Sequence, residues 1–231
     1  MTNETICCVS SVNDAAAERV RSLLAESGTL AVALLGPSGT GKTSLIHATA
    51  TALAGKARVA AIVAHPAADR DRAQLGQSCA AAIARAVVAP SALEMLKAIE
   101  SLDLQNLDVL LIEAIGEAEG GVPDLGHDAT AALFAASGGD DKAAECAALV
   151  AAADVILLSK MNLLPHVSFD RELFEADVLQ ANPSAERIDI DVDDADSLQR
   201  WTQWLTRQGL CKRLGAQSRS GEQIRPEFFV G

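Results

Sequence analysis

The sequence is poor in aromatic residues. Phe, Trp and Tyr together make up 3% of the 231 residues and Tyr is absent, whereas 49% of the residues are hydrophobic. A core must therefore be built mainly from Ala, Val, Leu and Ile, which favours helices packed closely on a sheet. A chain of this length is long enough for one sizeable α/β domain and short for two.

Positive charge is also scarce. The chain has 19 Lys and Arg against 31 Asp and Glu, a formal net charge of −12. Because nucleic-acid surfaces need clustered Lys and Arg, no nucleic-acid partner is expected. No window reaches the roughly 18 apolar residues of a membrane span, and Met1 is not followed by a basic and then apolar run. We expect a cytoplasmic protein that does not bind membranes.

Paired cysteines are lacking as well. The five cysteines are odd in number, show no Cys-x-x-Cys spacing and are scattered over the chain. This pattern does not indicate a disulfide framework, so reduced thiols are expected. The residues are Cys7, Cys8, Cys79, Cys146 and Cys211.

Apolar runs alternate with helical patterns along the chain. A helix is predicted over 13–26, with Asn13 as its N-cap and Gly28 after its end. A second helix is predicted over 43–54, closed by Gly55, and a last one over 198–205. The apolar or alternating runs cover 30–35, 59–63, 84–88, 109–112, 131–136, 155–158 and 187–192. The alternation predicts a doubly wound, mostly parallel sheet flanked by helices. We expect an N-terminal segment and helix over 1–27, a nucleotide-binding domain over 28–206 and a flexible tail over 207–231.

The stretch "GPSGTGKTS" stands directly between the first predicted strand and the helix that follows it. Its spacing is G-x-x-x-x-G-K-[ST], the phosphate-binding loop of nucleoside triphosphatases. Glycines let the backbone N–H groups curl towards phosphate, the lysine neutralises charge and the threonine hydroxyl can ligate Mg²⁺. The candidate nucleotide ligands are Gly36, Ser38, Gly39, Thr40, Gly41, Lys42, Thr43 and Ser44.

A second element, "LLIEAIG", places Glu113 at the end of a buried strand and Gly116 three residues later. A carboxylate at this edge of the sheet lies beside the phosphate loop, where it can hold Mg²⁺, and a glycine N–H can contact a γ-phosphate. We assign Glu113 as the candidate catalytic residue and, with Thr43, as a candidate Mg²⁺ ligand. Taken without the phosphate loop, the same glutamate is an ordinary residue at a solvated strand end.

With these pieces in order, the chain resembles the HypB/UreG family of SIMIBI-class P-loop GTPases, over about residues 20–205. The matching stretches are "LLGPSGTGKTSL", "LDLQNLDVLLIEAIG", "GGDDKA" and "AAADVILLSKMNLLPHVSFD", followed by "ANPSA" and a Leu/Trp-rich helix. The resemblance implies a GTP-dependent metallochaperone that delivers nickel, or binds zinc, during hydrogenase maturation. It also implies a homodimer formed on nucleotide binding, with hydrogenase maturation proteins or the large-subunit precursor as partners.

Several family positions are changed. His65, followed by Pro66, stands where the family has a first-switch Asp, although Asp69 and Asp71 are near. Imidazole is a poor Mg²⁺ ligand compared with a carboxylate, so slow or absent hydrolysis is expected. The positions of the family's metal-binding Cys-His pair and further Cys fall at about Val88-Ala89 and Gly120, and we find no nickel ligands there. An alternative is that His65, Cys79, His127 and Cys146 converge in a dimer.

The base-reading motif is changed too. GTPases use Asn-Lys-x-Asp, whose Asp accepts two hydrogen bonds from guanine, whereas this chain has Ser159-Lys160-Met161-Asn162. Lys160 can still stack on the base, but an amide satisfies only one of the two guanine donors. The unsatisfied donor costs roughly 1–3 kcal/mol. Asn162 therefore either contacts a purine or caps the turn that follows it.

The usual fifth motif, Ser-Ala-Lys, is replaced by Asp191-Val192-Asp193. Together these changes leave three hypotheses. The first is a HypB-like accessory protein that binds GTP or another purine nucleotide. The second is a degenerate paralogue, a nucleotide-binding scaffold with little hydrolysis and no nickel site. The third is a P-loop kinase, for which no second substrate site is evident.

Overall fold

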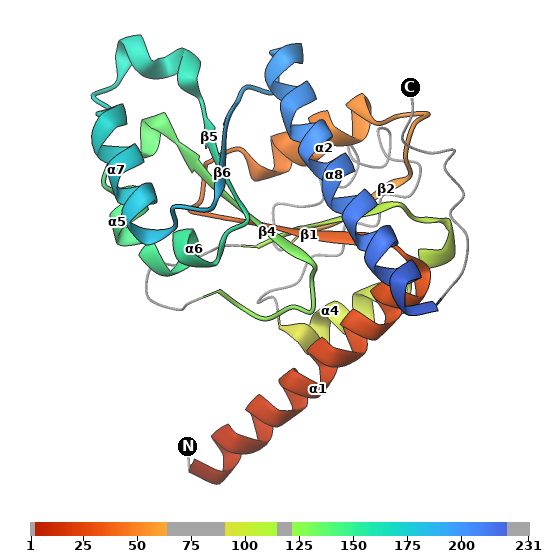
Figure 1. Ribbon diagram of the computed structural model, residues 1–231. Helices are drawn as coiled ribbons and strands as arrows, with labels where there is room; N and C mark the ends of the chain where they lie inside the picture. The colour runs from red at the N-terminus through yellow and green to blue at the C-terminus, as the bar shows by residue number, and fades with distance from the viewer. Residues whose placement is uncertain (1–2, 64–90, 115–121, 221–231) are drawn as a thin grey trace.

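Parallel strands form the centre of the computed structural model, which describes residues 3–63, 91–114 and 122–220 (Figure 1). Within these ranges one sheet has six strands in the order β2-β3-β1-β4-β5-β6, and every neighbouring pair is parallel. The bounds are β1 (Leu30–Leu35), β2 (Val59–Val63), β3 (Val109–Glu113), β4 (Ala129–Ala135), β5 (Val155–Ser159) and β6 (Glu186–Ile190). The predicted doubly wound parallel sheet is confirmed, and the run at 84–88 lies outside the described residues.

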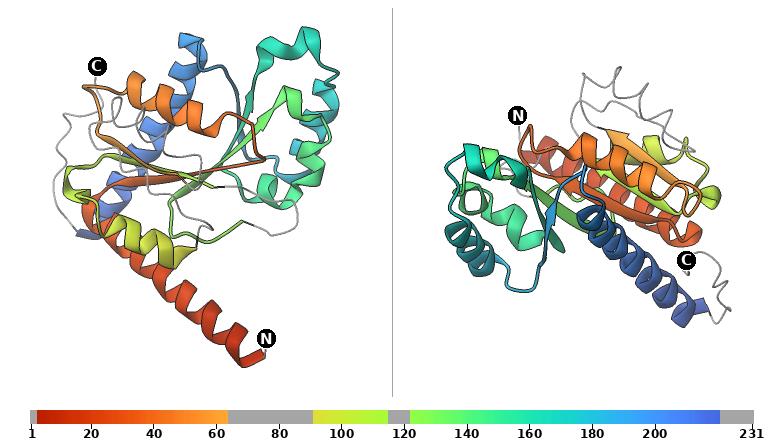
Figure 2. Two further views of the ribbon diagram at one scale, coloured as in Figure 1. Left: turned by 180° about the vertical axis from the view of Figure 1, so that it is seen from behind. Right: turned by 90° about the horizontal axis from the view of Figure 1, so that it is seen from above.

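Helices cover both faces of the sheet. They are α1 (Asn3–Ser27), α2 (Lys42–Ala52), α4 (Ala92–Ile99), α5 (Lys142–Glu145), α6 (Ala147–Ala152), α7 (Arg171–Ala181) and α8 (Ala195–Ser220). Short 3-10 turns occur at η1 (Leu104–Asn106), η2 (Ala136–Gly138) and η3 (Met161–His166). Figures 1 and 2 show α8 running diagonally across the sheet on the same side as α2, and α1 extending beyond the body at its amino end.

The two faces follow from the alternation of side chains along each strand. In β1, Leu30, Val32 and Leu34 pack in one buried cluster with residues of α2 and α8. The intervening Ala31 packs with α1 and α4, whereas Ala33 and Leu35 pack with α6 and α7. The largest side chains of the first cluster are Trp201 and Trp204 of α8, whose rings stack with centroids 5.3 Å apart.

Two helices are much longer than the sequence predicted. The helix α1 begins at Asn3, so Asn13 is not its N-cap. The side-chain oxygen of Asn13 instead accepts a hydrogen bond from the N–H of Ala92, at the start of α4, at 2.8 Å. The helix α8 continues to Ser220, so residues 207–220, predicted to belong to a flexible tail, are helical. Gly28, at φ +71°, ends α1 as expected.

Three aspartates form the same contact at the amino end of the sheet. Asp108, Asp128 and Asp154 each stand one residue before a strand. The carboxylate of each accepts the backbone N–H of a residue on the neighbouring chain segment, and that residue's carbonyl accepts the aspartate N–H in return. The partners are Arg58, Ala31 and Thr130, with carboxylate-to-nitrogen distances of 2.8 Å in each case. These pairs satisfy strand-end N–H groups that have no partner within the sheet.

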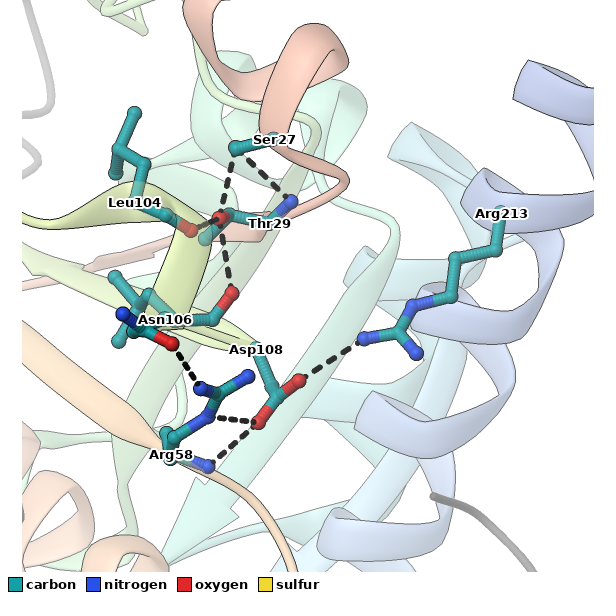
Figure 3. A network of polar contacts seen from close by, with 8 residues as sticks. Ser27, Thr29, Arg58, Leu104, Asn106, Asp108 and Arg213 are labelled. Atoms are coloured by element: carbon teal, nitrogen blue, oxygen red, sulfur yellow. Dashed lines mark hydrogen bonds and ion pairs between the residues drawn. The ribbon is translucent and has the colours of Figure 1, made fainter. Parts of the chain in front are cut away.

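The carboxyl half of α8 is tied to the same edge. Arg213 donates to Asp108 at 3.0 Å, on the opposite side of the carboxylate from Arg58 (Figure 3). Lys212 donates to Asp128 at 2.6 Å. Both aspartates therefore connect α8 to the strands that it crosses. None of the helices in the described ranges is long and apolar enough to cross a membrane.

Candidate functional site

The phosphate loop lies between β1 and α2, as the sequence predicted. Gly36 has φ +150°, and a Cβ added there would lie 2.1 Å from the carbonyl oxygen of Leu133 on β4. Gly41 is the N-cap of α2 with φ +97°, a left-handed conformation that glycine adopts without strain. The first N–H groups of a helix have no intrahelical acceptor, so this end of α2 is suited to bind an anion.

Lys42 lies beneath the loop rather than in solvent. Its side chain is buried, and Nζ donates to the carbonyl oxygens of Gly36 at 2.9 Å and Pro37 at 2.8 Å. Burial lowers the pKa of Lys42 from its ordinary value of 10.5, and the negative charge of Glu113 opposes that change. The ammonium is thus held at the centre of the loop, next to the only predicted catalytic carboxylate.

Thr43 and Glu113 are brought together from two elements. Thr43 is in the first turn of α2 and Glu113 ends β3, the strand beside β1. The Thr43 hydroxyl lies 3.0 Å from Oε1 and 2.9 Å from Oε2 of Glu113. A hydroxyl and a carboxylate in contact are oxygen donors of the kind that Mg²⁺ prefers, so these two residues fit the predicted ion. Gly116, the other predicted ligand of this segment, lies outside the described residues.

A cavity of about 160 Å³ lies beside the phosphate loop. Its walls come from the loop and α2, from the end of β5 and from the segment after β6, as expected for a base pocket. Lys160 and Asn162 both line it, together with Asp191, Val192 and Asp193. Asn162 is inside η3, whose N-cap is Lys160, so the structure does not place Asn162 at the cap of this turn.

Ser159 and Lys160, which directly precede η3, connect the pocket to the phosphate loop. The Ser159 hydroxyl is 2.7 Å from the Thr40 carbonyl oxygen and 3.0 Å from that of Phe134. Lys160 has φ +59°, and its Nζ donates to the Gly39 carbonyl oxygen at 2.6 Å. The base-reading segment and the phosphate loop therefore form one unit.

Sequence reasoning missed some walls of this site. Ser44 was expected as a phosphate-loop residue and does line the base cavity, but Leu133 and Ile190 had no motif to mark them, and Ser159 was named only as the first residue of the base-reading motif. A second cavity, of about 220 Å³, adjoins the loop and is lined by Ser38, Gly39, Ser137, Gly138 and Lys142, among others. The signal for this wall is the stretch "GGDDKA", which includes Gly138 and Lys142.

The positions that bear on the metal site are largely outside the described residues. They are His65, Pro66, Asp69, Asp71, Cys79, Val88, Ala89 and Gly120. In the part of the chain that the structure covers, no group of three or more His, Cys, Asp or Glu side chains is arranged to hold a metal. Cys146 is buried among apolar residues, and His127 Nε2 is 2.9 Å from the Thr130 hydroxyl.

Comparison with known proteins agrees with this geometry. A family model described as "CobW/HypB/UreG, nucleotide-binding domain" matches residues 30–189. The hydrogenase maturation factor HypB of Escherichia coli K12 is 29% identical over 200 residues, which are 85% of this chain and 69% of that protein.

Two solved structures share the fold. The hydrogenase maturation factor HypB from Archaeoglobus fulgidus has a TM-score of 0.77 at 27% identity, over 85% of this chain and 98% of that one. HypB from Helicobacter pylori, solved in complex with nickel, has a TM-score of 0.75 at 21% identity, over 94% of this chain and 99% of that one. The predicted P-loop fold of the SIMIBI class is confirmed.

Proposed function

Because the chain belongs to the CobW/HypB/UreG nucleotide-binding domain family, we propose that it is a HypB-like accessory protein for nickel insertion during hydrogenase maturation. In this proposal it acts in the cytoplasm, binds a purine nucleoside triphosphate with Mg²⁺ and forms a homodimer when the nucleotide is bound. Its partners are other hydrogenase maturation proteins or the hydrogenase large-subunit precursor. GTP is the nucleotide that the family resemblance implies.

The observation that carries the proposal is the contact of Thr43 with Glu113 beneath a phosphate loop of fitting geometry. Gly41 places the amino end of α2 at the loop, and Lys42 supplies a buried positive charge. These groups bind and orient phosphate oxygens. Bound Mg²⁺ would offset the charge of the phosphates, held by the Thr43 hydroxyl and the Glu113 carboxylate.

Nickel is the cargo in this proposal and not a resident cofactor. Support comes from the relatives, which are named hydrogenase maturation factors, and from the nickel complex of the Helicobacter pylori protein. Zinc is a second metal that the resemblance allows. No ligand is assigned to either metal, because the positions aligned with the family's metal-binding residues fall at about Val88-Ala89 and Gly120, which have no metal-binding side chains.

A second candidate function rests on a specific observation in the base pocket. The residue at the guanine-reading position is Asn162, and two carboxylates stand where the family has a Ser-Ala-Lys-like stretch. A protein altered in this way can retain nucleotide-dependent partner binding while it hydrolyses little and carries no nickel. This candidate is a nucleotide-binding scaffold.

The test measures turnover of GTP and ATP by the purified full chain, together with binding of nickel and zinc. Hydrolysis accompanied by stoichiometric nickel binding supports the accessory role and contradicts the scaffold. Nucleotide binding without turnover or nickel supports the scaffold. If neither nucleotides nor inorganic tripolyphosphate bind, both candidate functions are wrong.

A further inference from the structure

We propose that Ser197 is a positioning residue of the nucleotide site, whose hydroxyl holds one wall of the base cavity in place. The inference rests on the proposed nucleotide-binding function. The wall is the connection 191–194 between β6 and α8, which contributes Asp191, Val192 and Asp193 to the lining of the cavity. The connection contains no strand or helix of its own, so its place depends on the contacts that hold it.

The Ser197 hydroxyl contacts both backbone polar groups of Asp191. Its oxygen accepts the Asp191 N–H at 3.0 Å, and it lies 2.8 Å from the Asp191 carbonyl oxygen and 3.0 Å from that of Asp194. Since a hydroxyl has one proton, it donates to one of these carbonyl oxygens at a time. In either case one side chain joins the first residue after β6 to the first turn of α8.

Ser197 differs in its burial from the carboxylates around it. Its exposed fraction is 3%, whereas Asp193, Asp194 and Asp196 are exposed. The carboxylates of Asp191 and Asp194 also accept N–H groups of the turn, those of Asp193 and Ser197, at 3.0 Å each. A hydrogen bond shielded from water is electrostatically stronger than one that water can replace. We therefore expect the Ser197 hydroxyl to hold the wall more firmly than the carboxylates do.

The start of α8 is fixed in turn against the helix that follows the phosphate loop. One turn after Ser197, Trp201 is fully buried and its Nε1 donates to the Thr49 hydroxyl of α2 at 2.8 Å. The two helices lie on the same side of the sheet and contact each other (Figures 1 and 2). Another wall of the cavity comes from the start of α2, through Ser44 and Leu45. Through α8, Ser197 thus sets the place of the 191–194 wall relative to the phosphate-loop side of the cavity.

Loss of the hydroxyl should affect the nucleoside part of the ligand more than its phosphates. Val192 still packs against the core without it, so the chain can fold. The wall would sample more positions, and a nucleoside in the cavity would have to order it on binding, whichever purine it carries. The phosphates bind instead at Lys42 and the amino end of α2. A positioning role therefore predicts weaker nucleotide binding with unchanged binding of the phosphate chain alone.

The test measures binding of GDP, ADP and inorganic tripolyphosphate to the full chain and to Ser197→Ala, by calorimetry with Mg²⁺. We expect Ser197→Ala to weaken the tighter-binding nucleotide by at least about threefold, as for the loss of one or two hydrogen bonds, and to keep tripolyphosphate affinity within about twofold. Ser197→Cys keeps the size of the side chain with a weaker donor and acceptor, so its nucleotide affinity should be intermediate. It is also the test variant if Ser197→Ala does not fold.

The matched control is Thr29→Val, at the amino edge of the sheet. Thr29 is also buried, and its hydroxyl lies 3.1 Å and 3.0 Å from the carbonyl oxygens of Leu104 and Leu107 (Figure 3). Thr29 does not line the cavity, so Thr29→Val should lower the resistance to denaturant and leave nucleotide affinity unchanged.

Three results would overturn the inference while the proposed function stands. They are full nucleotide affinity in Ser197→Ala, equal losses for nucleotide and tripolyphosphate in that variant, and an equal loss of nucleotide affinity in Thr29→Val. The last two would show that general stability, and not the 191–194 wall, sets the affinity. If the unchanged chain binds none of the three ligands, the proposed function itself is wrong.

Discussion

The hydroxyl of Thr43 lies within 3.0 Å of both carboxylate oxygens of Glu113. The two residues are seventy positions apart in the sequence. They meet because β1 and β3 are adjacent parallel strands, so the residue that begins α2 after β1 comes to the edge where β3 ends. The contact joins the phosphate loop to the candidate catalytic carboxylate.

We therefore expect Thr43→Ala to remove most of the Mg²⁺-dependent gain in nucleotide affinity, by about tenfold, because the hydroxyl is one of the two fitted oxygen donors. The measurement is nucleotide binding with Mg²⁺ and with a chelator. Thr43→Ser keeps the hydroxyl and is the control. Equal Mg²⁺ dependence in Thr43→Ala and the unchanged protein would show that this hydroxyl does not serve the ion.

Gly36→Ala should destabilise the fold and disrupt the phosphate loop. The added Cβ would lie 2.1 Å from a backbone oxygen of β4, which cannot move like a flexible side chain. We expect a loss of at least about 2 kcal/mol in the free energy of unfolding, measured by denaturant titration. Gly215→Ala is the control, because this exposed position on α8 has nothing within 4 Å and an ordinary helical backbone. It should gain about 0.5–1 kcal/mol.

Because Trp201 of α8 and Thr49 of α2 share a hydrogen bond, we expect substitutions at these two positions to have coupled effects on stability. Trp201 Nε1 donates to the Thr49 hydroxyl at 2.8 Å in a fully buried position. Thr49→Val leaves the indole N–H without an acceptor and should cost about 1–3 kcal/mol of unfolding free energy. In the double variant with Trp201→Phe, the loss of unfolding free energy should be smaller than the sum of the losses in the two single variants, as measured by a double-mutant cycle. Strict additivity would show that the hydrogen bond does not contribute.

We expect the carboxyl group of Asp108 to cause part of the dependence of the unfolding free energy on pH. Burial raises the pKa of this carboxyl, but the backbone N–H and guanidinium of Arg58 and the guanidinium of Arg213 outweigh burial and lower it from its ordinary value of 3.8. The unfolded chain then binds more protons than the folded chain in this acidic range. The stabilisation is complete above the unfolded pKa and is lost as the pH falls through the lower folded pKa.

Asp108→Asn should therefore have a lower unfolding free energy at pH 7, by about 1–3 kcal/mol, and a shallower loss of stability on acidification. The measurement is denaturant unfolding from pH 7 to pH 2. Asp177→Asn, on α7 and away from this network, is expected to follow the unchanged protein. A loss on acidification as steep in Asp108→Asn as in the unchanged protein would contradict the assignment.

The sequence was sufficient where a local pattern determines the structure. The phosphate loop and the strands around it were predicted because their glycine spacing and apolar runs are continuous in the chain. Lys160 and Asn162 were placed in one pocket with the phosphate loop by their position after an apolar run. The residue identities of the base pocket also predict an altered base preference, which stays a prediction.

Elsewhere a distant partner decided the outcome. Asn13 has the side chain of an N-cap, but its oxygen contacts the first residue of α4, which no local pattern reveals. Residues 207–220 lack a strong apolar stripe, and Lys212 and Arg213 hold this part of α8 against Asp128 and Asp108. The hydrogen bonds of Ser159 were not predicted from its place in the base-reading motif, because its carbonyl partners, Thr40 and Phe134, belong to other segments.

The three reciprocal aspartate pairs at the amino edge have a consequence for how the strands find their partners. Strands made almost entirely of Ala, Val, Leu and Ile have similar shapes, so apolar packing discriminates weakly between a correct pairing and one slipped along the chain. A slip of one residue between β3 and β2, β4 and β1, or β5 and β4 would break the hydrogen bond between the aspartate carboxylate and the backbone N–H of the neighbouring strand segment. Asp108, Asp128 and Asp154 thus serve as register marks in a sheet whose apolar residues cannot set the alignment by themselves.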